Sequence, residues 1–312
     1  MITVSEENLI NYEVTARIAT EAFGSKEVLF FAERMKWLYE RSFGQGTTVV
    51  SVSDDGVKVG QIALIRQIIV SDGEPCVAAQ LVDLFILRAY RSPPLIGRVY
   101  KEVERLCLAQ NIRFILAMPN EKSESLNARF LKLKPALRLH IRAGIGLRGP
   151  RSSKLKYSGH LKSMTKTAAI ELLSGYATTA EGTGLRWDGE TLFNRTNDPT
   201  CDYAAHATAD LLLISSCRGT RGVKYTLLCG FFVRSEADVT SNSTRELIRA
   251  ACRFWQHPIF VYAGANSALP RLPGFALPHR LRRPMLVQFR DIAADETKVR
   301  FDRFQLIDSD FA

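Results

Sequence analysis

The residues whose types could do chemistry lie between positions 80 and 127 of the sequence. Asp83 is the only acid in the apolar run from Leu81 to Leu87, and Gln80 directly precedes that run. A carboxylate in apolar surroundings is costly unless it is paired. Asp83 is therefore either a catalytic general base or the structural partner of an arginine, and the sequence leaves both interpretations open.

An arginine-led turn follows the apolar run. Arg91 precedes Ser92-Pro93-Pro94, after which apolar residues recur at helical spacing. The first NH groups of such a helix lack intrahelical partners and lie at the positive end of the helix dipole, so they can bind a phosphate or a pyrophosphate. The candidate phosphate-binding residues of this turn are Arg91, Leu95, Ile96, Gly97 and Arg98.

Positioning these residues requires strands that alternate with helices. The apolar run predicts a strand that is covered on both faces, and the residues after it predict a helix, a second strand and a second helix. Upstream, Asp54-Asp55-Gly56 predicts the turn of a hairpin, and Ser5 with Asn8 predicts a capped helix that runs to Phe23. The predicted elements around the arginine-led turn are a strand at 81–87, a helix from Leu95, a strand at 113–118 and a helix at 123–133.

This order of elements resembles the core of the GNAT superfamily of N-acyltransferases, which has an apolar strand, an arginine-led turn opening a helix, a strand ending in Pro-Asn and a second helix. The resemblance covers residues 1–147 and includes Phe130-Leu131-Lys132-Leu133 at the end of the second helix. It implies that a splay between the two strands holds the pantetheine arm of an acyl-CoA donor. It also implies a base for the acceptor amine, for which Gln80 is the nearest match and Asp83 the nearest carboxylate. The further donor-binding positions that it implies are Leu84, Phe85, Ile86, Asn120, Ser123 and Asn127.

The chain departs from the family pattern at the turn and at the end of the second helix. The family turn reads Arg or Gln, two residues, Gly, one residue, Gly or Ala, but here Pro94 and Ile96 stand at the glycine positions and Gly97 comes one place late. Proline has no NH to donate, and isoleucine prevents close backbone approach. Phe130 stands where the family often has a tyrosine that protonates the leaving thiolate, and a phenyl ring cannot donate a proton.

These departures bear on the donor and on activity. The expected function is transfer of an acyl group from a pantetheine thioester to an amine such as an amino acid or amino sugar; the alternative is an inactive GNAT-like binding or assembly module. The formal net charge of +10 favours anionic partners. An acyl carrier protein presents pantetheine with one phosphate on an acidic surface, so the divergent turn suits it better than acyl-CoA. Nucleic acid is not expected, because no stacking motif or recognition helix accompanies the charge.

The length of 312 residues predicts two domains, since one domain of this kind needs about 150. A basic segment rich in Gly, Ser and Pro at 148–163 predicts a linker between a GNAT-like domain at 1–147 and a second one at 164–312. Strand, helix, strand and Gly-Phe recur in the second half, which predicts a degenerate GNAT-like repeat. The expected fold class is therefore α/β, of the α+β kind with a mixed sheet. Each of the two domains should have a mostly antiparallel sheet with a central splay flanked by helices.

The remaining patterns predict a protein of the cytoplasm without a metal site. Six cysteines and five histidines are scattered at spacings typical of neither zinc ligands nor a disulfide framework. The polar N-terminus and the lack of a long apolar stretch predict neither a signal peptide nor a membrane span. Near the chain end, Asp308 and Asp310 form either a grip for a substrate amine or a polar terminus, and the sequence leaves both interpretations open.

Overall fold

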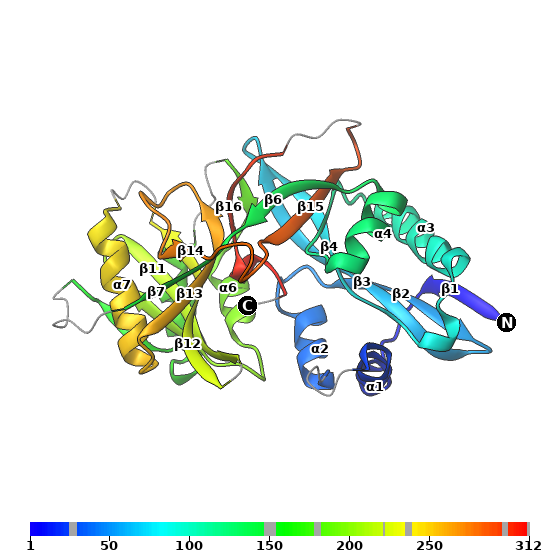
Figure 1. The fold of residues 1–312 in the computed structure, drawn as a ribbon, viewed down its shortest axis with the longest axis horizontal. Helices are drawn as coiled ribbons and strands as arrows, with labels where there is room; N and C mark the ends of the chain where they lie inside the picture. The colour runs from blue at the N-terminus through cyan, green and yellow to red at the C-terminus, as the bar shows by residue number, and fades with distance from the viewer. Residues whose placement is uncertain are drawn as a thin grey trace. The chain divides into compact units, whose positions relative to one another are not determined.

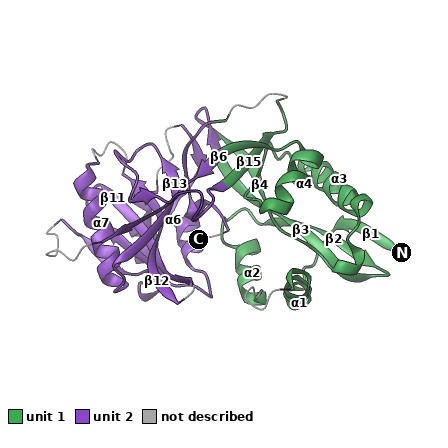
Figure 2. Cartoon of the chain, in the orientation of Figure 1, with its two compact units in different colours: residues 1–69, 75–136, 286–299 green, residues 70–74, 137–285, 300–312 purple. Residues whose placement is uncertain are grey.

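The computed structural model describes residues 1–24, 30–146, 154–177, 182–220, 222–234, 239–294 and 299–310. The chain has a mixed α/β fold and divides into two compact units (Figures 1 and 2). The predicted fold class is confirmed. Within the described residues, no helix is both long and apolar enough to cross a lipid bilayer. Unit 1 comprises residues 1–69, 75–136 and 286–299, and unit 2 comprises residues 70–74, 137–285 and 300–312.

Unit 1 contains the strands and helices around the arginine-led turn. The hairpin predicted at Asp55-Gly56 is confirmed, since both residues have a positive φ, of 45° and 81°, as a tight two-residue turn requires. The elements in chain order are β1 (Ile2–Glu6), α1 (Tyr12–Phe23), α2 (Ala32–Glu40), β2 (Thr47–Asp54), β3 (Val57–Ser71), β4 (Glu74–Ile86), the 3₁₀ helix η1 (Arg88–Tyr90), α3 (Pro93–Ala109), β5 (Phe114–Ala117), α4 (Glu121–Leu131), β6 (Lys134–Leu139) and β15 (Met285–Asp291).

The sheet of unit 1 has the strand order β1-β2-β3-β4-β5-β15. β1 with β2, β2 with β3 and β5 with β15 are antiparallel pairs, whereas β4 and β5 are parallel. The parallel pairing runs from Ala78↔Phe114 to Leu81↔Ala117 and stops there. Because β4 continues to Ile86 while β5 ends at Ala117, the backbone of β4 beyond Leu81 has no partner on β5.

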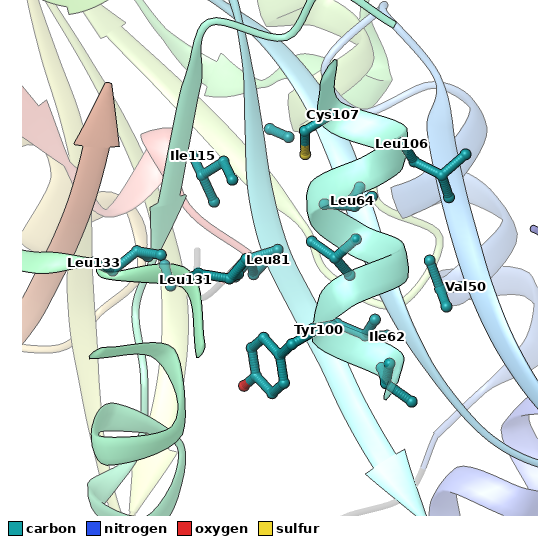
Figure 3. Close-up of a cluster of buried hydrophobic side chains, with 14 of the residues drawn as sticks. Val50, Ile62, Leu64, Leu81, Tyr100, Leu106, Cys107, Ile115, Leu131 and Leu133 are labelled. Atoms are coloured by element: carbon teal, nitrogen blue, oxygen red, sulfur yellow. The ribbon is translucent and has the colours of Figure 1, made fainter. Parts of the chain in front are cut away.

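α3 and α4 cover one face of this sheet. α3 is amphipathic, and its buried side chains Leu95, Val99, Val103 and Leu106 lie one helical turn apart. They pack against strand residues such as Leu64 in one cluster of buried side chains (Figure 3). Each fully buried aliphatic side chain contributes about 1.5–3 kcal/mol of transfer free energy. The apolar stripe of α3 therefore fixes how the first turn of this helix lies against the end of β4.

Unit 2 has strands and helices of its own. Its central strands follow the order β8-β10-β11-β12-β13, and β13 also pairs with β7 and with β16. The elements in chain order are β7 (Ile141–Ile145), β8 (Tyr157–His160), the 3₁₀ helix η2 (Leu161–Ser163), α5 (Lys166–Ser174), β9 (Thr183–Leu185), α6 (Gly189–Thr196), β10 (Tyr203–Ala207), β11 (Leu211–Thr220), β12 (Val223–Val233), α7 (Ser241–Phe254), β13 (Ile259–Asn266), β14 (Phe275–Ala276), β16 (Phe301–Gln305) and the 3₁₀ helix η3 (Leu306–Asp308).

β12, α7 and β13 repeat the arrangement of β4, α3 and β5. β12 and β13 pair in parallel only from Thr226↔Phe260 to Leu228↔Tyr262. In the β11–β12 ladder, Ser215 pairs with Leu228 and Ile214 with Gly230, so Cys229 is an extra residue that bulges out of β12. Unit 2 therefore also has a bulged strand, a crossover helix and a short parallel pair.

The N-terminus differs from the prediction. The predicted helix from Ser5 is wrong, because Ile2–Glu6 form β1 and pair with β2. The helix starts later, at a cap formed by Asn11, whose Oδ1 accepts a hydrogen bond from the Val14 NH at 3.1 Å. It ends at Gly24, which has a left-handed φ of 61°.

The compact units also differ from the predicted domain boundaries. β15 lies in unit 1 because its backbone pairs with β5, and the Arg113 guanidinium forms an ion pair with Asp291 at 3.3 Å. Of the predicted linker at 148–163, residues 148–153 lie outside the described residues. The rest is not a free connection, since Tyr157–His160 form β8 and pair with β10.

Candidate functional site

A cavity of about 520 Å³ lies in unit 1 beside the end of β4. This volume is within the range of small-molecule sites, about 300–1,000 Å³. Four segments form its wall, namely the last turn of α1, the end of β4, the arginine-led turn with the start of α3, and the start of α4. The lining residues are Ala22, Phe23, Leu84, Phe85, Ile86, Arg91, Ile96, Asn120, Glu121, Lys122, Ser123 and Leu126.

Most of the predicted donor-binding residues line this cavity, and four do not. Leu95 is buried in the core under α3. Gly97 faces the ring of Phe130, Arg98 donates a hydrogen bond to the Ile2 carbonyl at 3.2 Å, and Asn127 is buried between α4 and β15. The predicted residues that do line the cavity are Leu84, Phe85, Ile86, Arg91, Ile96, Asn120 and Ser123.

A bulge at Asp83 directs the end of β4 toward the cavity. Asp83 has a left-handed φ of 51°, which is uncommon for a residue other than glycine. Ala79 and Leu81 before it, and Leu84 and Ile86 after it, all pack against the same core cluster. Odd positions before the bulge and even positions after it thus share one face, so the bulge shifts the side-chain alternation by one residue.

The Asp83 side chain is held from the other face of the sheet, by α2. Tyr39 donates a hydrogen bond to Asp83 Oδ2 at 2.7 Å, and Gln61 Nε2 donates one to the Tyr39 hydroxyl at 2.7 Å. Burial raises the pKa of Asp83, whereas the hydrogen bond from Tyr39 and the charge of Arg34 oppose that rise. Burial also raises the pKa of Tyr39, which keeps its hydroxyl a donor. A carboxyl group with a raised pKa is a stronger base when it is ionised.

Gln80, the other predicted catalytic residue, lies on β4 before the bulge and is buried. Its Oε1 accepts a hydrogen bond from Gln67 Nε2 at 2.9 Å. It does not line the cavity. Of the two predicted catalytic residues, only Asp83 directly precedes the lining residues.

The arginine-led turn offers little backbone to an anion. Pro93 and Pro94 occupy the first two positions of α3, so these positions have no NH, and Ser92 makes no side-chain cap. The Arg91 guanidinium connects the end of β4 to the last turn of α1. Its Nε donates to the Ile86 carbonyl at 2.8 Å and its Nη2 to the Ala22 carbonyl at 2.5 Å. The turn thus keeps a positive charge at the cavity wall while lacking two NH groups of a phosphate cradle.

Phe130, which stands in the position of the family's tyrosine, has no hydroxyl. Phe130 stacks on Tyr100 with ring centroids 5.4 Å apart. The Tyr100 hydroxyl is turned into the protein, where it donates to Asn127 Oδ1 at 2.7 Å, and Asn127 Nδ2 donates to Gln288 Oε1 at 3.1 Å. These residues form a structural connection between α3, α4 and β15.

The sequence did not point to several residues of the site. Tyr39 is one, although a tyrosine among apolar residues on one side of a predicted helix suggests a buried hydroxyl in need of a partner. Phe23 is another, and its 44% exposure at the end of α1 is a feature of the fold that the sequence pattern does not show. Lys122 and Leu126 also line the cavity, since α4 starts beside it.

In unit 2 the chain itself fills the gap between β12 and β13. The Phe231 NH donates to Gln305 Oε1 at 2.8 Å, and Gln305 Nε2 donates to the Phe231 carbonyl at 3.0 Å. The Tyr262 hydroxyl also donates to Gln305 Oε1, at 3.2 Å. One side-chain amide thus satisfies both backbone groups of a residue that follows the bulge at Cys229, as a neighbouring strand would.

Asp308 belongs to the same filled region. It is buried, and it accepts hydrogen bonds from Trp187 Nε1 at 2.7 Å and from the Gln305 NH at 2.6 Å. Burial raises its pKa. Asp308 is therefore a buried hydrogen-bond acceptor that holds the end of β16. It is neither a grip for a substrate amine nor part of a polar terminus, the two interpretations that the sequence left open.

No protein-family model and no curated protein matches the sequence. Solved structures do match its fold. A conserved Enterococcus faecalis protein described as a "Probable N-Acyltransferase" superposes with a TM-score of 0.65 at 12% identity, over 94% of this chain and 73% of its own. A GCN5-related N-acetyltransferase from Anabaena variabilis gives 0.62 at 11% identity, over 93% and 73%.

Saccharomyces cerevisiae N-myristoyltransferase, solved with bound myristoyl-CoA, gives a TM-score of 0.58 at 11% identity, over 93% of this chain and 79% of its own. The TM-scores establish the fold. At such low identities the activity has to be argued from the site itself. The chain therefore has the fold of the GNAT superfamily of N-acyltransferases.

Proposed function

We propose that the chain is an N-acyltransferase that moves an acyl group from a pantetheine thioester to an amine in the cavity of unit 1. The observation that carries this proposal is the position of Asp83, a half-buried carboxylate in a bulge directly before the residues that line the cavity. Backbone strain and a raised pKa at the edge of a cavity are typical of catalytic groups.

Pantetheine suits this cavity because its amides can pair with a strand backbone and its methyl and methylene groups can contact apolar side chains. β4 beyond Leu81 has no partner on β5, so its backbone can pair with the amides of a ligand. Unit 2 supports this argument, since there the Gln305 amide pairs with the Phe231 backbone just after the bulge. In unit 1 the corresponding stretch of β4 borders a cavity instead.

We infer that the donor carries one phosphate, as an acyl carrier protein does, rather than the pyrophosphate of acyl-CoA. Pro93 and Pro94 remove two NH groups that a pyrophosphate would use. Arg91 is bound to two carbonyls and still provides a positive charge, and Lys122 also lines the cavity. The net charge of +10 also favours an acidic carrier.

The reaction follows from these positions. Asp83 accepts a proton from the acceptor ammonium, directly or through one water. The amine nitrogen then attacks the thioester carbonyl and the new C–N bond forms. As this adduct collapses, the nitrogen gives its second proton to solvent and the C–S bond breaks with the electron pair leaving on sulfur. Solvent protonates the thiolate, because Phe130 cannot. The acceptor is an amine-bearing molecule such as an amino acid or an amino sugar.

We also propose that unit 2 is a second GNAT-like domain that does not bind the donor. The order of β12, α7 and β13 supports the first part of this proposal. Gln305 supports the second, since its amide already occupies the backbone groups that pantetheine would need.

The test measures thiol release from acyl carrier protein and acyl-CoA donors with a set of amines. Asp83→Asn should lower kcat/KM by about 10²–10⁴-fold, the usual contribution of a general base. Asp72→Asn is the matched control, since Asp72 is an exposed aspartate with a similar φ of 53°. Equal activity of wild-type and Asp83→Asn proteins would reject Asp83 as the base.

An inactive binding module is the second candidate. Phe130 in place of a tyrosine and the Pro93-Pro94 turn favour it. This candidate predicts that a pantetheine thioester raises the melting temperature without being consumed in the presence of any amine. Turnover that depends on Asp83 would exclude it.

A further inference from the structure

Unit 2 has a cavity of about 450 Å³ that is separate from the cavity of unit 1 and shares no residue with it. It lies between α7, the end of β7 and the segment 271–275. Its volume is in the range of small-molecule sites, about 300–1,000 Å³. None of the features used for the proposed acyl transfer involves it.

The cavity exists because the two units continue differently after the crossover. In unit 1 the strand β5 is followed by α4, which packs Phe130 against Gly97 and Tyr100 of α3. In unit 2 the described chain from 267 to 274 contains no helix after β13. A face of α7 that includes Thr244 and Ile248 is therefore left beside a hollow.

The walls of this hollow are held in place by specific contacts. Arg142 on β7 donates from Nε to the Pro273 carbonyl at 2.7 Å and from Nη2 to the Gly274 carbonyl at 2.6 Å. Gly274 has a φ of 67°, and a Cβ there would lie 2.5 Å from the Ala143 carbonyl oxygen. Only glycine fits, so the segment is fixed closely against β7.

Three arginines line the cavity. Arg245 and Arg249 lie one turn apart on α7, and Arg271 belongs to the segment that faces this helix. Arg245 Nη1 is 3.4 Å from Asn242 Oδ1, and within the described residues none of the three forms an ion pair. Three cations around one hollow, with no carboxylate partner in the part of the chain that the structure describes, attract an anion.

The rest of the lining is apolar. Phe260 and Ile248 are buried at the base, while Ile145 and Phe275 are 67% and 74% exposed at the rim. Large apolar side chains exposed beside a cavity mark binding sites, because leaving them in water is unfavourable. An inorganic anion or a nucleotide phosphate would leave these walls uncovered. A ligand with an anionic head and a hydrocarbon chain would satisfy both parts.

We propose that this cavity binds a fatty carboxylate, with its head group on Arg249 and Arg271 and its chain on Ile145, Phe260 and Phe275. A carboxylate suits arginine because the planar guanidinium donates two parallel hydrogen bonds. The proposal does not depend on acyl transfer, so loss of one leaves the other intact.

The test is calorimetric titration of the full chain with dodecanoate below its critical micelle concentration. Decanoate should bind about tenfold or more weakly, since each buried methylene contributes about fourfold. Arg249→Gln and Arg271→Gln should each weaken dodecanoate binding about tenfold or more, as expected for a charge-assisted hydrogen bond. Arg280→Gln is the matched control, because Arg280 is exposed in unit 2 and does not line the cavity.

Three further outcomes would overturn the proposal. Dodecylammonium binding as tightly as dodecanoate would show that charge plays no part. Inorganic phosphate binding as tightly would show an anion site without a chain site. Equal losses in Arg280→Gln and Arg249→Gln would show attraction by general surface charge. Circular dichroism and the melting temperature of each variant confirm that it is folded, and Ile145→Asp provides a second variant that removes the chain contact without touching an arginine.

Discussion

Acidification from pH 7 to pH 5 should destabilise the folded chain by about 2 kcal/mol through His206 alone. His206 is buried on β10, with Nδ1 2.8 Å from Ser158 Oγ and Nε2 2.8 Å from Ser215 Oγ. Trp255 Nε1 donates to the same Ser215 oxygen at 2.9 Å. Burial, assisted by the charge of nearby His160, lowers the pKa of His206 to about 3.

The sign and size follow from linkage. The folded pKa lies below the unfolded value of about 6.5, so the unfolded state binds the proton first. The stabilisation is fully present above pH 6.5 and is lost as the pH falls toward 3. At pH 5 the unfolded histidine is about 97% protonated while the folded one is neutral, which corresponds to about 2 kcal/mol at 1.36 kcal/mol per pKa unit.

Urea unfolding of the wild-type chain and of His206→Gln at both pH values measures the contribution of His206 to the free energy of unfolding. Hydrogen exchange of the β10 amides then reports the stability around this residue. The variant should be less stable at pH 7, because it loses ring packing against Phe254, but it should lack the extra loss at pH 5. The reasoning is refuted if both proteins lose equal stability. It is also refuted if the His206 ring resonance in the folded protein titrates near pH 6.5.

Three other predictions concern residues beside the end of β4 in unit 1 and beside β12 in unit 2. Tyr39→Phe removes a hydrogen bond that favours ionised Asp83, so the acid limb of the kcat/KM profile should move to higher pH, and an unmoved limb would separate Tyr39 from the base. Gly60→Ala places a methyl group 2.7 Å from a β4 carbonyl and should cost about 1–3 kcal/mol in thermal unfolding, whereas unchanged stability would contradict this close approach. Gln305→Leu leaves the Phe231 NH without its partner, at about 1–3 kcal/mol, while the Phe231 carbonyl keeps the hydrogen bond from Asn266 Nδ2; exchange of the Phe231 amide should become faster, and it would stay slow if another group replaced the Gln305 side chain.

The elements around the cavity were predictable because short-range signals define them. Asp55-Gly56 needs only its own backbone preference to form a turn. Asn120 caps α4 by accepting from the NH groups of Lys122 and Ser123, both at 3.0 Å. The apolar period of α3 likewise follows from neighbouring turns, so its position after β4 could be predicted without knowledge of the rest of the chain.

Long-range pairings could not be predicted in the same way. The ion pair of Arg113 with Asp291 and the amide pairing of Gln305 with Phe231 join segments far apart in the sequence. Nothing in the periodicity of either strand records its partner, since a β-strand pattern specifies a buried face and not a neighbour. The boundaries of the two units depend on such pairings, which explains why they differ from a division at the Gly/Ser/Pro segment.

The site residues divide along the same line. The resemblance placed the end of β4 and Arg91 beside the donor, and these residues line the cavity. Around α3 it could not separate side chains that point into the core from those that point outward, so Leu95 was grouped with Ile96. The sequence also does not predict the left-handed bulge at Asp83, because an aspartate in an apolar strand does not indicate a shift in the side-chain alternation.

Phe130 in place of a tyrosine does not prevent acyl transfer, because protonation of the leaving thiolate does not require an acid from the protein. A thiol has a pKa of about 8.5, so sulfur can leave as thiolate and take its proton from water afterwards. Proton removal from the amine cannot be postponed, since an ammonium has no lone pair with which to attack. Phe130 cannot serve as the acid, whereas Asp83, the base that we propose, has a pKa that burial raises, which makes its carboxylate a stronger base. The proton that must leave the amine before attack thus has a proposed acceptor in Asp83, whereas the proton that sulfur takes up last can come from solvent, and this favours acyl transfer over an inactive module.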